Sequence, residues 1–148
     1  MQRHKLMTAV LVAATSLAAA LVPASASVSA GSQPRDHVVV IDCFSNPQVR
    51  PGEYLIACGD GNNGLTELKW SEWGSSSAKG HGLNYVNDCI PYCAAGKFHS
   101  YPVNVTLERP EPWKKHPGQL RFTQLRIVFT TDSKPAHAQQ EVTYKLWP

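Results

Sequence analysis

The sequence predicts a small all-β domain, a β-sandwich or barrel of about seven short strands held by two disulfides. Three observations lead to this prediction. Most of the chain alternates short β-branched or aromatic runs with turns rich in Gly, Pro and Asn. No segment beyond the first thirty residues shows the helical period of 3.6. The chain also carries four cysteines, an even number, downstream of an apolar N-terminal segment.

The first 26 residues are predicted to be a secretion signal that is cleaved off. Arg3 and Lys5 make a short basic start, and an apolar run of about 17 residues follows. The run leads to residues 24–26 (Ala-Ser-Ala), the small-x-small pattern that a signal peptidase recognises, with a weaker cleavage site after Ala30. A retained membrane anchor is the alternative, but the run only just reaches a spanning length. No later stretch is long enough, so we expect no membrane span after cleavage.

The remaining chain is predicted to be one domain. Removing 26 of the 148 residues leaves 122, which suits a single modest core. Residues 27–34 are small and polar and are expected to be a flexible lead-in, so the domain covers residues 35–148. Twelve of the fourteen Lys and Arg residues remain, against eleven Asp and Glu. This near-neutral, scattered charge predicts no nucleic-acid partner and no polybasic membrane surface.

Seven runs have the residue types of strands, bounded by Gly, Pro or Asn. In chain order they cover residues 38–42, 52–58, 65–73, 82–88, 102–110, 120–131 and 142–147. Between the second and third runs, Asn63-Gly64 is the pair favoured in a tight hairpin turn, because both positions tolerate positive φ. In the third run, Leu68 and Trp70 share one face, and we expect Trp70 in the core.

The two longest runs differ in regularity. Residues 102–110 alternate apolar with polar side chains and form the clearest strand. In the next run, Leu120 and Phe122 have one parity, whereas Leu125 and the apolar residues after it have the other. A strict two-residue period cannot place both sets inside, so we expect a β-bulge or bend near Thr123-Gln124.

The four cysteines are predicted to form two disulfides, because thiols of an exported domain tend to pair. Of the three connectivities we choose the sequential one, Cys43–Cys58 with Cys89–Cys93. Loop entropy then contributes about 3 kcal/mol for the first and about 2 kcal/mol for the second. The alternatives are a zinc site that uses Cys89, Cys93 and His99, which lacks a matched fourth ligand, and a redox centre, which lacks Cys-x-x-Cys before a helix. We therefore expect no metal and no cofactor.

No catalytic motif is recognisable, so we do not expect an enzyme. The Gly-Ser-Ser-Ser run at residues 74–77 lacks the spacing of a nucleophile elbow. Residues 60–64 (DGNNG) lack the later ligands of a calcium loop. The alternative function is a small secreted hydrolase in which His99 acts with Asp60 or Asp88, since all three flank the disulfide-bonded segments.

Aromatic side chains suggest binding instead. Tyr92 and Tyr101 flank the Cys89–Cys93 loop, and Trp113 lies in a charged, Pro-flanked loop. An exposed ring on a rigid loop can stack on a sugar or contact an apolar partner. We therefore expect a secreted monomer, either free or associated with the cell envelope, that binds a cell-wall glycan or an extracellular protein. The alternative for Trp113 is that it folds back over one end of the sandwich.

Four motifs give a resemblance to a known group. They are Cys-x-Asp-Gly-Asn at residues 58–62, Trp-x-x-Trp at 70–73, Asn-Asp-Cys-x-Pro-x-Cys-Ala-x-Gly at 87–96 and Phe-His-x-Tyr-Pro-Val at 98–103. With these motifs, residues 43 to about 110 resemble small secreted actinobacterial proteins of uncharacterised function. The resemblance implies export and a bacterial source, and it implies no activity.

Overall fold

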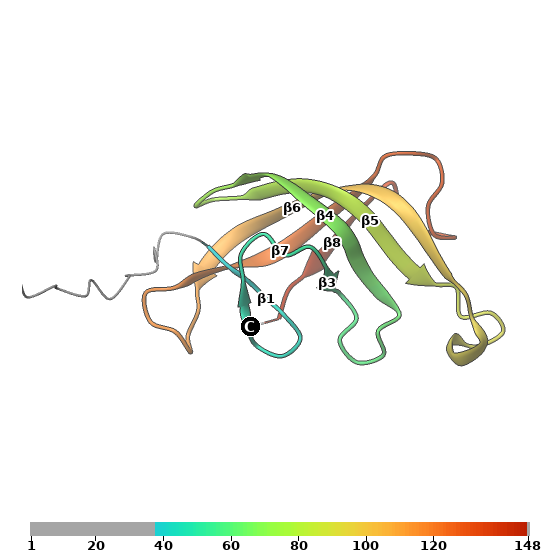
Figure 1. The fold of residues 1–148 in the computed structure, drawn as a ribbon, viewed down its shortest axis with the longest axis horizontal. Helices are drawn as coiled ribbons and strands as arrows, with labels where there is room; N and C mark the ends of the chain where they lie inside the picture. The colour runs from blue at the N-terminus through green and yellow to red at the C-terminus, as the bar shows by residue number, and fades with distance from the viewer. Residues whose placement is uncertain (1–37, 148) are drawn as a thin grey trace, which may run out of the picture. The chain divides into compact units, whose positions relative to one another are not determined.

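The computed structural model describes residues 38–147, which form an all-β domain and confirm the predicted fold class (Figure 1). Six strands form one antiparallel sheet in the order β3-β4-β5-β6-β7-β8, curled as a half-barrel, and β1 and β2 form a separate pair. The strands are β1 (Val40–Ile41), β2 (Pro47–Gln48), β3 (Tyr54–Leu55), β4 (Asn63–Trp73), β5 (Ala78–Asn87), β6 (Phe98–Pro112), β7 (Leu120–Phe129) and β8 (Glu141–Lys145). One 3₁₀ turn, η1 (Cys93–Ala95), lies between β5 and β6.

Every predicted run overlaps a strand, and β2 is an additional strand that was not predicted. The alternation in β6 is confirmed, because Val103, Val105 and Leu107 are all buried. They belong to the main core on the concave side of the sheet, where β1 and β3 lie under the arch (Figure 1). The predicted signal segment 1–26 and lead-in 27–34 lie outside the described residues.

The predicted hairpin turn at Asn63-Gly64 was wrong, since both residues belong to β4. The turn lies before them, where Gly61 has φ +70° and its N–H donates to the Ala57 carbonyl at 2.9 Å. Gly64 is paired with Tyr85, and a Cβ on Gly64 would lie 2.3 Å from the Tyr85 hydroxyl oxygen. The glycine therefore makes room for an aromatic ring on the neighbouring strand.

Two register shifts bend β4 against β5, one at Glu67, where φ is +53°, and one after Trp70. Because a bulge changes which face a residue takes, Leu65 and Leu68 are both buried although they are three residues apart. Trp70 packs against the core but stays half-exposed. A Cβ on Gly80 of β5 would lie 3.1 Å from the Trp70 ring. Bulges and a small residue beneath a large ring thus curve this half of the sheet.

The bend expected near Thr123-Gln124 is found on the facing strand. β7 keeps one register with β6 along its paired length. Across from Thr123, Arg109 of β6 has φ +53°, and its carbonyl accepts a hydrogen bond from the Thr123 hydroxyl at 2.8 Å. Phe122 and Leu125 are both buried. The buried hydroxyl is therefore satisfied by the backbone of the bent strand.

The start of β7 is covered by the segment that leads into β1. Val39 donates to the Leu120 carbonyl at 3.0 Å and accepts from the Phe122 N–H at 2.8 Å, in a parallel bridge. The side chains of Val39, Ile41 and Trp113 form a second, smaller apolar cluster. This cluster anchors the 113–119 loop to one end of the sheet.

Both disulfides form with the predicted pairing. Cys43 and Cys58, 15 residues apart, join the β1–β2 loop to the turn after β3 with a Cα–Cα distance of 5.5 Å. Cys89 and Cys93, four residues apart, close a short loop between β5 and β6 with a Cα–Cα distance of 3.7 Å. The second pair excludes a zinc site built on these thiols, because both are consumed in the bond.

Candidate functional site

The loop at residues 88–97, between β5 and β6, is fixed at its base by a buried amide. The Asn87 side-chain NH₂ donates to the side-chain oxygen of Asn62 at 2.9 Å and to the Cys93 carbonyl at 2.8 Å. Its side-chain oxygen accepts from the Cys89 N–H at 3.0 Å. One side chain therefore ties the disulfide loop to the turn before β4, and the loop is held from both sides.

Asp88 fixes the same loop through its carboxylate. The carboxylate accepts from the Lys97 N–H at 2.9 Å, from His99 Nε2 at 2.9 Å and from the Ile90 N–H at 3.1 Å. The hydrogen bond from the Lys97 backbone, followed by those from His99 and Ile90, lowers the pKa of Asp88 to about 2. Asp88 is therefore a carboxylate throughout the neutral range.

The two carboxylates considered for a hydrolase behave differently. Asp88 meets His99 at 2.9 Å, whereas the Asp60 carboxylate accepts from the Asn62 N–H at 3.1 Å. Within residues 38–147, the Asp88 carboxylate is the only hydrogen-bond partner of the His99 ring. A dyad of this kind can orient an imidazole as a base. In the described part of the chain no Ser, Thr or Cys side chain completes it.

The three aromatic residues considered for ligand binding do not form one surface. Tyr92 is 63% exposed on the 88–97 loop, whereas Tyr101 is half-buried and packs against the core. Trp113 is only 4% exposed, so it is not displayed, and the alternative that it folds back over one end of the β domain is confirmed. It packs on Val39 and Ile41, and its ring stacks on His116 with centroids 3.5 Å apart. Figure 1 shows the 88–97 and 113–119 loops at opposite ends of the sheet.

Two residues join Tyr92 that sequence reasoning did not select. Ile90 is 71% exposed and Phe98 is 56% exposed. The Phe98 ring lies 5.9 Å from that of Tyr85 on the neighbouring strand. We call Ile90, Tyr92 and Phe98 the apolar end patch; they are three of the six large hydrophobic residues exposed within residues 38–147. The sequence signal that could have found this patch was the presence of three large apolar residues in and beside the loop closed by Cys89 and Cys93.

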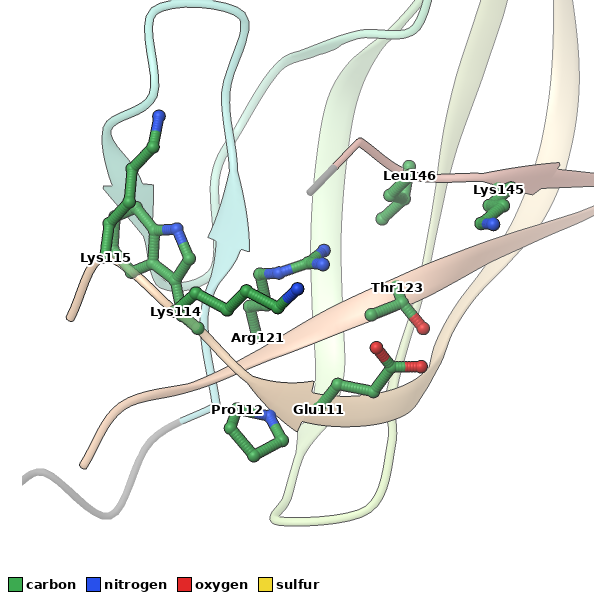
Figure 2. A pocket seen from close by; sticks show the side chains of 9 residues that line it. Glu111, Pro112, Lys114, Lys115, Arg121, Thr123, Lys145 and Leu146 are labelled. Atoms are coloured by element: carbon green, nitrogen blue, oxygen red, sulfur yellow. The ribbon is translucent and has the colours of Figure 1, made fainter. Parts of the chain in front are cut away.

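Two cavities lie away from this loop. One, of about 400 Å³, is lined by the 135–139 segment and by residues of β4, β5, β7 and β8, among them two hydrogen-bonded amides. There the Asn84 side chain donates to Asn63 at 2.7 Å, and Asn63 donates to the Tyr144 hydroxyl at 3.2 Å. The other, of about 470 Å³, lies beside the 113–119 loop and is drawn in Figure 2. Its lining comes from three separate segments, which the spacing of residues along the chain does not bring together.

Comparisons with known proteins add no relative to this description. No protein-family model matches the chain, and no curated protein or solved structure matches it either. Among residues 38–147, no three His, Cys, Asp or Glu side chains are grouped in a way that could hold a metal ion. The described residues also contain no helix long and apolar enough to cross a bilayer.

Proposed function

We propose that this chain is a secreted binding domain that contacts a cell-envelope glycan or an extracellular protein through the apolar end patch. The observation that carries the proposal is the exposure of Ile90 and Tyr92 on a loop that is fixed internally, with Phe98 exposed beside it at the start of β6. Export is supported by the N-terminal segment and by two disulfides, which are compatible with an extracellular protein.

The physical argument rests on the unfavourable exposure of these apolar side chains to water. Large apolar groups gathered on a surface mark interaction sites more often than chance placement does. Aromatic side chains are also the commonest anchors of protein interfaces and stack well on sugars. Because the Cys89–Cys93 bond and the Asn87 amide already fix the loop, a partner orders little chain on binding.

A small hydrolase is the second candidate, since His99 and Asp88 meet at 2.9 Å. Two features favour a positioning role for this pair instead. The Asp88 carboxylate also accepts hydrogen bonds from two backbone N–H groups of the loop. In the described part of the chain, no Ser, Thr or Cys side chain bonds to His99 as a nucleophile would. A His99→Ala protein that retains any hydrolysis detected for the wild type would remove this candidate.

The test compares Tyr92→Ala and Phe98→Ala with the wild-type exported protein. The matched control is Phe44→Ala, which removes an 83% exposed ring outside the patch. Co-sedimentation with insoluble cell-wall glycan and cross-linking to extracellular proteins measure the two ligand classes separately. We expect each patch variant to weaken retention about tenfold, as interface anchors do. Retention equal to that of Phe44→Ala, in both assays, would refute the proposal.

A further inference from the structure

The cavity of about 470 Å³ beside the 113–119 loop is unusually basic. Four of its lining side chains are cationic, namely Lys114, Lys115, Arg121 and Lys145, and one, Glu111, is a carboxylate. We call this space the basic cavity. Its cations come from the 113–119 loop, from β7 and from the end of β8, so the fold gathers them from three segments. The field inside a concave site of one sign concentrates counter-ions.

Arg121 is the buried member of the group. It is only 8% exposed, and its Nη1 donates to the Trp147 carbonyl at 2.7 Å. Within residues 38–147, no Asp or Glu lies within ion-pair distance of it. One guanidinium nitrogen is therefore held by the backbone, and no carboxylate of the described residues balances the charge of the group.

The other guanidinium nitrogens of Arg121 face accessible space. Among the described residues, the indole nitrogen of Trp147 is the one fully buried side-chain polar atom without a partner. The unbonded Arg121 nitrogens are therefore not sealed in the core, and the cavity that Arg121 lines is where they are exposed. They remain free to donate hydrogen bonds to a ligand there.

Glu111 does not neutralise Arg121 although the two face each other in the β6–β7 ladder. Figure 2 shows its carboxylate directed toward Thr123, while the Lys114 side chain points in the direction of the Arg121 guanidinium. Lys114, Lys115 and Lys145 also make no ion pair within residues 38–147. A fixed guanidinium thus shares the cavity with three lysines, of which Lys114 points toward it in Figure 2, and these flexible side chains can adjust to a ligand.

Apart from Thr123, the rest of the lining is apolar. Trp113 and Leu146 are both buried and form part of the cavity wall. The volume of about 470 Å³ falls in the range of small-molecule sites. A bare inorganic ion would leave most of this space and the apolar wall unused.

We propose that the basic cavity binds a small organic oxyanion, with its carboxylate or phosphate ester on Arg121 and its body against Trp113 and Leu146. A planar guanidinium accepts either group in a two-point hydrogen-bonded pair. The lysines supply long-range attraction and additional contacts. The site is independent of the apolar end patch, which lies at the other end of the sheet (Figure 1).

Phenyl phosphate is a suitable probe because it combines the charged group with a flat apolar body. Binding is followed by NMR shifts of ¹⁵N-labelled protein, with phenol and inorganic phosphate as comparison ligands. We expect saturable shifts in residues 111–123 and 145–146, tighter binding of phenyl phosphate than of either comparison ligand, and weaker binding as salt is raised. Absence of saturable shifts in these residues would overturn the proposal. Equal affinity for inorganic phosphate would overturn the role of the apolar wall.

Variants separate the guanidinium from general charge. Arg121→Met should weaken phenyl phosphate binding by tenfold or more, because the two-point contact is lost. Because this change also removes the bond to Trp147, the Lys114→Met/Lys115→Met protein is a second variant on exposed positions and should weaken binding about threefold to fivefold. Lys97→Met, on the 88–97 loop, is the matched control. Affinities unchanged in both cavity variants would refute the assignment.

Discussion

Replacing Trp113 by Ala tests how much the packing of this ring contributes to the stability of the fold. Trp113 is 4% exposed and forms one cluster with Val39 and Ile41. Removing a buried Trp typically costs about 3 to 5 kcal/mol. Because Trp113 borders the basic cavity and packs on only two buried aliphatic side chains, we expect the lower end, about 3 kcal/mol. That is a large share of the roughly 5 to 15 kcal/mol that stabilises a typical domain.

The assay is urea unfolding of the oxidised protein, followed by far-UV circular dichroism. The Trp113→Ala midpoint should fall with little change in slope, which indicates lost stability rather than a changed denatured state. Tyr92→Ala is the control, since it is 63% exposed and should change stability by less than about 0.5 kcal/mol. A loss below about 1 kcal/mol for Trp113→Ala would refute the packing account. The ring would then have to be explained by a ligand.

Two further predictions concern the loops. Changing Cys43 and Cys58 together to Ser should lower the unfolding free energy by about 3 kcal/mol, and the same change at Cys89 and Cys93 should lower it by about 2 kcal/mol. Both are measured by urea unfolding without reductant. A larger loss for the Cys89 and Cys93 variant would contradict the loop-entropy account. Asp88 has its pKa lowered from 3.8 to about 2, so it stabilises the fold above about pH 4 and this contribution is lost as the pH falls toward 2. The wild type should therefore exceed Asp88→Asn in stability at pH 5, and the gap should close on acidification; a gap independent of pH would exclude this role for Asp88.

The sequence predicted the strands well where one face is buried. In β6 the alternation of Val103, Val105 and Leu107 follows directly from a sheet with one core face. It failed at Asn63-Gly64, where local turn preference favoured a hairpin but the Tyr85 ring requires a glycine within the sheet. It also placed the bend on β7, whereas the structure bends β6 at Arg109. The alternation of apolar residues within one strand does not show which of two paired strands will bend.

The candidate sites were less accessible to sequence reasoning. The disulfide loop and its Tyr92 were found because cysteine spacing is a local signal. The sequence left display and burial of Trp113 both open, because its burial depends on Val39 and Ile41 reaching the same end of the sheet. The basic cavity was missed for a similar reason. Its cations lie at positions 114, 115, 121 and 145, and only the fold brings them together.

One strand links the two proposed binding sites. β6 begins at Phe98 in the apolar end patch and ends at Pro112, beside the basic cavity. At about 3.3 Å per residue, a strand of 15 residues separates its ends by up to about 45 Å, and curvature shortens this only in part. One small ligand cannot contact both sites, and a paired strand inside a sheet has no second arrangement through which to couple them. Phe98→Ala should therefore leave the affinity for phenyl phosphate unchanged, and Arg121→Met should leave retention on the glycan or protein unchanged. If both variants weakened the binding of one partner, that partner would have to be large enough to contact both ends.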